Sequence, residues 1–165
     1  MSSASSGQRL THVDERGAAR MVDVSGKQPG ARTAVATGVL RTTEEVVRLL
    51  RAEALPKGDA LATARIAGIM GAKRTPDLIP LCHPIALSGV TVDLDLSGSE
   101  VRITATVRTT DRTGVEMEAL TAVAVAGLAL HDMVKAVDPA AVLDAVRVER
   151  KEGGKTGLWT RQEDQ

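Results

Sequence analysis

Asp132 and Lys135 are two ionisable residues three positions apart, near the end of a long apolar segment. In a helix this spacing puts both side chains on one face, where the carboxylate can accept a hydrogen bond from the ammonium group. Two interpretations follow. The residues form either an exposed surface pair worth a few tenths of a kcal/mol, or an acid/base pair in which each group tunes the proton affinity of the other.

The segment 115–137 that carries this pair has the pattern of a helix, and Pro139 follows it. At 100° per residue an apolar stripe forms an evident core face. The opposite stripe consists of Glu118, Thr121, Val125, Leu128, Asp132 and Lys135. Its middle carries no charge, whereas a solvated face would carry Lys and Glu at most positions. We therefore expect a helix buried on both sides, with Glu118, Asp132 and Lys135 sharing a partly desolvated environment.

Cys82 and His83 lie in a proline-rich connection, 74–89, in which functional groups are often held rigidly. A Cys–His nucleophile pair is disfavoured, because adjacent side chains in an extended segment point to opposite sides. The three histidines and Cys82 show no metal-ligand spacing, which disfavours a metal site. His83 as a hydrogen-bonding or proton-transfer group, with Cys82 packed as a small apolar side chain, is preferred. An ordinary loop histidine remains the alternative.

Basic residues near predicted helix ends suggest a phosphate site. Lys57 stands beside Gly58 and Asp59, where the amides of a helix start can bind an anion. The alternative is a simple linker in which Asp59 caps the helix. Further basic groups are Lys73, Arg74, Arg147, Arg150, Lys151 and Lys155. Taken alone, such groups are most often solvated.

The run Gly154-Lys155-Thr156 resembles the end of a phosphate-binding P-loop, but the match fails. The first glycine of that motif would fall at position 149, which is Glu149, and no helix-forming stretch follows. The P-loop interpretation is rejected.

The elements that must position these groups follow a clear order. Alternating residues predict a strand over 32–41, a hairpin of strands over 90–96 and 101–107, and a last strand over 145–150. Thr42 and Glu45 match a capping box that opens a first helix, and a second helix runs from Asp59 to about Lys73. This order predicts an α+β, ferredoxin-like fold: a four-stranded antiparallel sheet with helices packed on one face.

The predicted organisation is one catalytic domain over 11–157, with a disordered tail at 1–10 and a flexible tail at 158–165. Charges balance at 21 basic against 21 acidic, and Trp159 is the only aromatic residue of Phe, Tyr and Trp type. Duplex binding and base stacking are therefore disfavoured. One cysteine allows no internal disulfide, the polar start is no signal peptide, and the apolar run 122–130 is too short to span a bilayer. These features predict a cytoplasmic protein.

Three blocks carry a family resemblance: Thr11-His12 with Met21-Val22-Asp23-Val24-Ser25, then KGDALATARIAGIMGAKRTPDLIPLCHPIALS at 57–88, then TGVEMEALTAVAVAGLALHDMVKAVD at 113–138. Together they resemble the cyclic pyranopterin monophosphate synthase family of molybdenum cofactor biosynthesis. The resemblance covers nearly all of the chain from about residue 10 to residue 157. It implies a lyase that converts (8S)-3',8-cyclo-7,8-dihydroguanosine 5'-triphosphate to cyclic pyranopterin monophosphate and diphosphate.

The resemblance also implies roles for individual residues. Lys57, Asp132 and Lys135 would be catalytic acid/base groups. The substrate would be bound by Leu81, Cys82, His83, Met117, Glu118, Glu116, Lys73, Arg74, Lys151 and Arg32, with Asp23 nearby. No cofactor or metal site of the protein's own is expected, although Mg²⁺ can accompany the triphosphate.

The family assembly implied is a homohexamer, a trimer of dimers, with active sites at subunit interfaces and no nucleic-acid or membrane partner. The competing interpretation is a non-catalytic nucleotide- or pterin-binding module on the same fold. An RNA-binding sheet is less favoured, because the predicted strands carry no aromatic residues.

Overall fold

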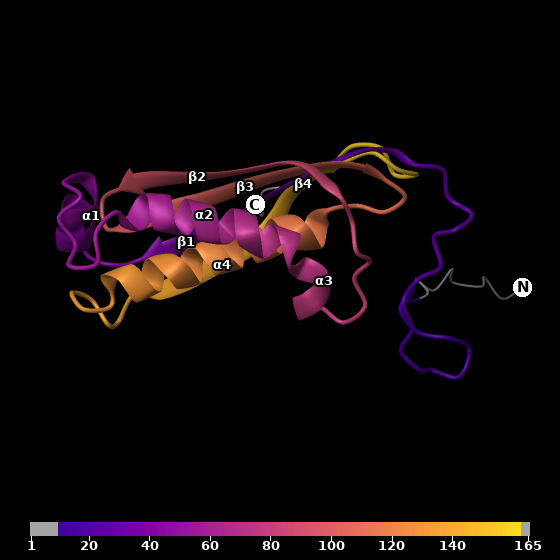
Figure 1. Ribbon diagram of the computed structural model, residues 1–165, viewed down its shortest axis with the longest axis horizontal. Coiled ribbons are helices and arrows are strands. Elements are labelled where there is room, and N and C mark those ends of the chain that lie inside the picture. The colour runs from indigo at the N-terminus through magenta and orange to yellow at the C-terminus, as the bar shows by residue number, and fades with distance from the viewer. Residues whose placement is uncertain (1–9, 163–165) are drawn as a thin grey trace, which may run out of the picture.

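The computed structural model describes residues 10–162. Figure 1 shows one sheet with two long helices lying side by side against it. The strands are β1 (Gly30–Arg41), β2 (Leu87–Ser97), β3 (Glu100–Asp111), β4 (Val142–Glu152) and β5 (Trp159–Thr160). The helices are α1 (Glu44–Arg51), α2 (Ala60–Lys73), α3 (Thr75–Leu78) and α4 (Glu116–Val134).

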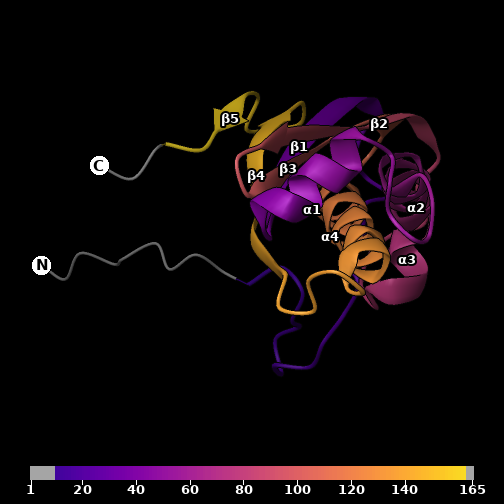
Figure 2. The same cartoon turned by 90° about the vertical axis from the view of Figure 1, so that its left-hand side faces the viewer.

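The sheet has the order β2-β3-β1-β4-β5 and every strand pair is antiparallel. The long helices α2 and α4 cover the same face (Figure 2), so the predicted ferredoxin-like α+β fold is confirmed. The predicted hairpin is present as β2 and β3, with Val90 opposite Val107. Gly98 closes its two-residue turn with a φ of +53°, which glycine adopts without strain.

Side chains along β3 are alternately buried and exposed, which identifies the two faces of the sheet. Val101, Ile103 and Val107 are fully buried under the helices, whereas Arg102 and Arg108, which each follow a buried valine, are exposed. Because successive side chains point to opposite faces of a sheet, this one strand separates the helix-covered face from the open face.

Small residues let α2 and α4 approach each other closely in a core without Phe or Tyr. A Cβ added at Gly68 of α2 would lie 2.9 Å from the Ala122 carbonyl oxygen of α4. One added at Gly71 would meet the Val125 side chain at 2.8 Å. Close backbone approach therefore takes the place of large side chains in filling this layer.

Helix α4 is long and apolar enough to cross a membrane by length and composition, with a mean hydropathy of 1.4. However, it packs against the sheet on one side and against α2 on another, and Ala119, Val123, Ala126 and Leu130 are completely buried there. The core of the folded domain accounts for its apolar composition.

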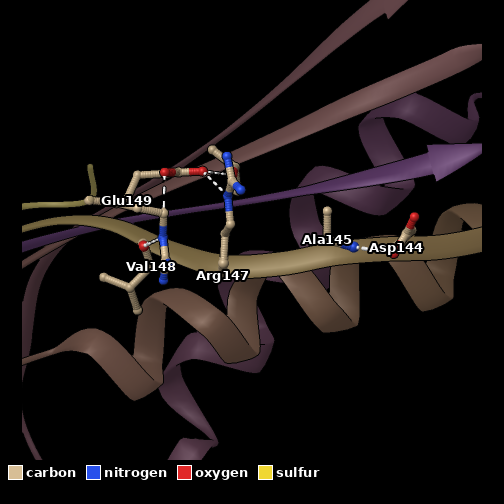
Figure 3. A network of polar contacts seen from close by, with 7 residues as sticks. Asp144, Ala145, Arg147, Val148 and Glu149 are labelled. Atoms are coloured by element: carbon tan, nitrogen blue, oxygen red, sulfur yellow. Dashed lines mark hydrogen bonds and ion pairs between the residues drawn. The ribbon is translucent and has the colours of Figure 1, made fainter. Parts of the chain in front are cut away.

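The open face of β4 carries a set of polar contacts that join it to its neighbours (Figure 3). The Glu149 carboxylate accepts hydrogen bonds from Thr37 Oγ1 at 2.6 Å and from Arg147 Nε at 2.7 Å. Asp144 accepts a hydrogen bond from Arg41 Nε at 3.0 Å. These contacts fix β4 against β1 despite two irregularities in their register.

Three local predictions need correction. Thr43, not Thr42, caps α1, because its side chain accepts the Val46 amide, whereas the Thr42 hydroxyl donates to Asp138 at 2.7 Å. The connection 74–89 is not wholly irregular, since it contains α3 and the start of β2. The sheet has five strands rather than four, because Trp159–Thr160 pair with β4.

The fifth strand lies within the segment 158–165 that was expected to be a flexible tail. Two residues are too few to show an alternating pattern, so β5 could not be predicted from periodicity. The predicted disordered tail, residues 1–10, falls outside the described residues except for Leu10.

Candidate functional site

Lys57, Asp132 and Lys135 meet at the carboxyl end of α4. Asp132 lies in the last turn of this helix, Lys135 is its C-cap, and Lys57 comes from the turn before α2. The Asp132 carboxylate accepts from Lys57 Nζ through Oδ2 and from Lys135 Nζ through Oδ1, both at 2.7 Å. The three predicted catalytic residues therefore form one cluster, here called the lysine–aspartate cluster.

Two ammonium groups on one carboxylate strongly favour its charged form. The hydrogen bond from Lys135, followed by that from Lys57, lowers the pKa of Asp132 to about 2. Asp132 is consequently an acceptor at any physiological pH. The cluster goes beyond the simple i,i+3 surface pair considered above, because Lys57 joins from 75 positions away.

The expected desolvation of this cluster is not present in the single chain. The side chains of Lys57, Asp132 and Lys135 are 44%, 52% and 53% exposed. Only Glu118, at the other end of the same helix face, is buried, with 3% exposure. The residues of this stripe thus lie in two environments rather than one.

A second group of predicted residues surrounds a cavity of about 360 Å³ at the amino end of α4. Its lining includes six residues of the predicted substrate set: Leu81, Cys82, His83, Glu116, Met117 and Glu118. The proline-rich connection supplies three of them and the first turn of α4 the others. We call this space the histidine cavity.

Burial raises the pKa of two groups in the histidine cavity. Desolvation raises the pKa of Glu118, and the neighbouring Glu116 carboxylate adds to the effect. Desolvation also raises the pKa of the Cys82 thiol, again with a contribution from Glu118. Cys82 is therefore held as a thiol, which agrees with a packing role and not with a nucleophilic thiolate.

His83 makes a specific hydrogen bond, which an unconstrained loop histidine would lack. Its Nε2 lies 2.6 Å from the Val22 carbonyl oxygen. Because a carbonyl oxygen only accepts hydrogen bonds, Nε2 must carry a proton in this contact. In the neutral imidazole, Nδ1 is then the nitrogen that can accept a hydrogen bond. The contact also anchors the N-terminal segment 10–29 that extends beyond the sheet in Figure 1.

A larger cavity of about 620 Å³ adjoins the histidine cavity, and the two share Lys27, Gly114 and Glu116. Arg32 and Lys151 of the predicted substrate set line it, and Lys151 Nζ pairs with Glu116 Oε1 at 3.1 Å. We call it the basic cavity. It brings the predicted residues Arg32, Lys151 and Glu116 to one place.

The predicted site residues do not all lie at one place within a single protomer. Glu118 and Asp132 are 14 positions apart on α4, a separation of about 21 Å at the rise of an α-helix. The lysine–aspartate cluster is therefore remote from both cavities. Lys73 and Arg74 lie at the end of α2 and line neither cavity.

Some lining groups were missed from the sequence. Lys27 lies in a short segment without periodicity, so only the fold reveals its place between the cavities. The Val22 carbonyl belongs to the backbone and leaves no signal in side-chain chemistry. Within residues 10–162, no group of three or more His, Cys, Asp or Glu side chains could hold a metal ion.

Comparison with known proteins fits this arrangement of residues. A model of the MoaC family matches residues 21–154. The chain belongs to the MoaC family. The matched range includes α4, the proline-rich connection and every predicted site residue, from Arg32 to Lys151.

Curated relatives of the family are similar over almost their full length. A protein of Streptomyces coelicolor named cyclic pyranopterin monophosphate synthase is 71% identical over 153 residues, which are 93% of this chain and 90% of the relative. A protein of Mycobacterium tuberculosis strain H37Rv, named cyclic pyranopterin monophosphate synthase 2, is 65% identical over 92% of this chain and 91% of its own.

A relative in Corynebacterium glutamicum strain R, also named cyclic pyranopterin monophosphate synthase, is 58% identical over 93% of this chain and 99% of its own. The predicted resemblance is thereby confirmed, as are its class, an enzyme, and its connection with molybdenum cofactor biosynthesis.

Proposed function

We propose that this chain converts (8S)-3',8-cyclo-7,8-dihydroguanosine 5'-triphosphate to cyclic pyranopterin monophosphate and diphosphate. The observation that carries the proposal is Asp132 held between Lys57 and Lys135, at 2.7 Å from each ammonium nitrogen. Rearranging a ring requires several proton transfers, and a carboxylate bonded to two amines can orient and exchange protons for them. The names of the relatives support the same reaction.

The pterin-forming ring fits best in the histidine cavity. His83 Nδ1 supplies an acceptor, and Glu118, whose pKa is raised by burial, can supply a proton as a hydrogen-bond donor. With no Phe or Tyr in the chain, aliphatic contacts from residues such as Leu81 and Met117 must hold the ring faces. The phosphates extend toward the basic cavity, where Lys151 and Arg32 are placed.

The catalytic cluster reaches this substrate only from another copy of the chain. About 21 Å separates Glu118 from Asp132 within one protomer, so one protomer supplies the cavities and a second supplies Lys57, Asp132 and Lys135. Exposed apolar side chains on α2 and α4, including Ile66, Met70 and Leu128, favour such association. We infer a homohexamer built as a trimer of dimers, acting in the cytoplasm.

The chemistry proposed requires no redox cofactor and no transition metal. The acid/base groups are supplied by side chains, and Mg²⁺ can accompany the triphosphate as its counter-ion. Full activity is expected after exposure to a zinc-selective chelator in the presence of Mg²⁺. Loss of activity that only zinc restores would contradict this part of the proposal.

Turnover distinguishes the proposed enzyme from a non-catalytic nucleotide- or pterin-binding module. The wild-type protein is expected to release diphosphate from the cyclic dihydroguanosine triphosphate, and Lys57→Ala and Lys135→Ala to lose that activity while remaining folded. Circular dichroism melting checks the fold of each variant. Binding without diphosphate release by the wild type, or near-wild-type rates in either variant, would refute the assignment.

A further inference from the structure

Thr109 is the polar end of an otherwise apolar row of side chains on β3. The side chains of this row, which face the helices, are in order Val101, Ile103, Ala105, Val107 and Thr109. Thr109 is buried like the others, with 2% exposure. A buried hydroxyl is costly unless it forms a hydrogen bond, and this one donates to the Ala86 carbonyl oxygen at 2.6 Å. The position is therefore suited to a hydroxyl and not to a further aliphatic side chain.

The Ala86 carbonyl lies where the proline-rich connection enters β2. Leu87 pairs with Thr109 across the two strands, but the register of the pairing shifts between Leu87 and Gly89. Irregularities of this kind often redirect a strand beside a functional site. The Thr109 hydroxyl thus holds the chain just before the irregularity, by a bond that spans 23 positions of sequence.

The other end of the connection is held by a second buried hydroxyl. Thr75 is completely buried, and its Oγ1 donates to a carbonyl oxygen in the last turn of α2 at 2.9 Å. Two backbone hydrogen bonds extend this anchor along the connection: the Ile79 amide donates to Thr75 at 2.9 Å, and the Cys82 amide donates to Ile79 at 3.1 Å. The connection is thus fastened by Thr75 and by Thr109, on either side of His83.

The imidazole of His83 lies close in sequence to the carbonyl that Thr109 holds. Only Pro84 and Ile85 stand between His83 and Ala86. The ring of Pro84 fixes one backbone φ, so the short link has little freedom, and Ile85 itself lines the histidine cavity. A shift at Ala86 is therefore transmitted to His83 and to its 2.6 Å contact with the Val22 carbonyl oxygen.

We propose that Thr109 is a positioning residue for the histidine cavity: its hydrogen bond to Ala86 sets the place at which His83 presents Nδ1 to the ligand. The inference rests on the proposed function, in which that nitrogen accepts a hydrogen bond from the pterin-forming ring. Thr109 lines neither cavity, so it acts through the connection and not by contact with the ring. Without the hydroxyl the connection takes up several positions, and binding of the ring must then include the cost of ordering it.

Calorimetric binding of cyclic pyranopterin monophosphate to the assembled protein tests this role. Thr109→Val removes the hydroxyl at nearly constant size and should weaken binding about five- to tenfold, the scale of one lost hydrogen bond. Thr109→Ser keeps the hydroxyl and should restore most of the affinity.

Thr37→Val is the matched control. The Thr37 hydroxyl is also nearly buried and also donates at 2.6 Å, but its acceptor is Glu149 on the open face of the sheet. Both valine variants should lower the melting temperature by about a few degrees, whereas the affinity of Thr37→Val should match that of the wild type. A loss of affinity as large in Thr37→Val as in Thr109→Val would show a general effect of stability and overturn the inference.

A double-mutant cycle shows whether Thr109 acts through His83. If it does, Thr109→Val should weaken binding no further in a His83→Ala background, because the group that it positions is already absent. Equal losses in the two backgrounds would overturn the inference. So would unchanged affinity in Thr109→Val, or a loss of affinity that Thr109→Ser does not restore.

Hydrogen exchange in the ligand-free protein separates failure of this inference from failure of the proposed function. Amides in the segment 79–89 should exchange faster in Thr109→Val than in wild type, and should be unchanged in Thr109→Ser and Thr37→Val. Unchanged exchange in Thr109→Val would overturn the positioning role whatever the activity. A wild-type protein that releases no diphosphate would overturn the proposed function, and the exchange rates would still decide whether Thr109 holds the connection.

Discussion

Asp132 is the central residue of the proposed chemistry, because its carboxylate pairs with both Lys57 and Lys135. Replacing it with Asn preserves size but removes the negative charge that orients the two ammonium groups. Since the side chain is half exposed, the fold should tolerate the change. A loss of activity in this variant would therefore reflect the lost charge and not a loss of folding.

We expect Asp132→Asn to lower kcat by about a hundredfold or more, the scale typical of positioned acid/base groups, with a melting temperature close to wild type. Asp144→Asn is the matched control, because Asp144 is also an exposed aspartate bonded to a basic side chain, Arg41. That control should keep its activity. An active Asp132→Asn protein would remove the cluster from the mechanism.

Glu118 provides a prediction about stability and pH. Its pKa is raised in the folded protein because burial disfavours the charged form. The folded state therefore binds the proton more tightly than the unfolded chain does. The associated stability is fully present below the unfolded pKa and is lost as the pH rises through the raised folded value.

Glu118→Gln removes this titration and should raise the free energy of unfolding at neutral pH relative to wild type, with the gap closing as the pH falls toward 4. Urea unfolding at several pH values measures both quantities. A Gln variant that is less stable than wild type at pH 7, or a gap that widens in acid, would show that the fold favours the charged form of Glu118 and lowers its pKa.

At this scale, residue types and spacing were sufficient to predict that Asp132 and Lys135 share a face and that His83 makes a hydrogen bond. They could not predict the Val22 carbonyl as its partner, because any backbone carbonyl is chemically the same. They also failed on desolvation: Asp132 is exposed in the single chain, because it lies on the outer side of α4, whereas Met133 and Val134 beside it are buried in the core.

At the scale of elements, the close contact of α2 with α4 holds the two ends of α4 in place. Gly68→Ala should destabilise the protein by about 1–3 kcal/mol, the usual cost of overpacking a dense interior, because the new Cβ would press on the Ala122 carbonyl. Gly30→Ala is the control: it meets no atom within 4 Å and has an ordinary φ. Thermal unfolding of both variants decides the point, and equal stabilities would contradict the packing account.

Periodicity predicted the elements well where they are long. The alternation of 90–96 and 101–107 gave the hairpin, and Asp59 was correctly identified as the cap of α2, where its side chain accepts the Ala62 amide. Short elements were missed for a physical reason. α3 has four residues and β5 has two, and neither is long enough to repeat a pattern.

At the scale of the whole molecule, one protomer presents two incomplete halves of a site at opposite ends of α4. The histidine and basic cavities can bind a ring and its phosphates, and the lysine–aspartate cluster can move protons, but about 21 Å lies between them. No rotamer change spans that distance. The sequence alone could not show that the site is divided between subunits. The spacing along α4 puts Glu118 and Asp132 on the same helix face, but it does not show that they belong to sites in different protomer pairs.

The measurement that tests this account most directly is complementation between two inactive chains. Asp132→Asn lacks the catalytic half and His83→Ala lacks the binding half, so each protein alone should be inactive. Co-expressed in equal amounts, random pairing gives half of the dimers one intact site out of two, and about a quarter of wild-type activity is expected. Mixed oligomers that form, as native mass spectrometry would show, and yet remain inactive would contradict a site shared between subunits.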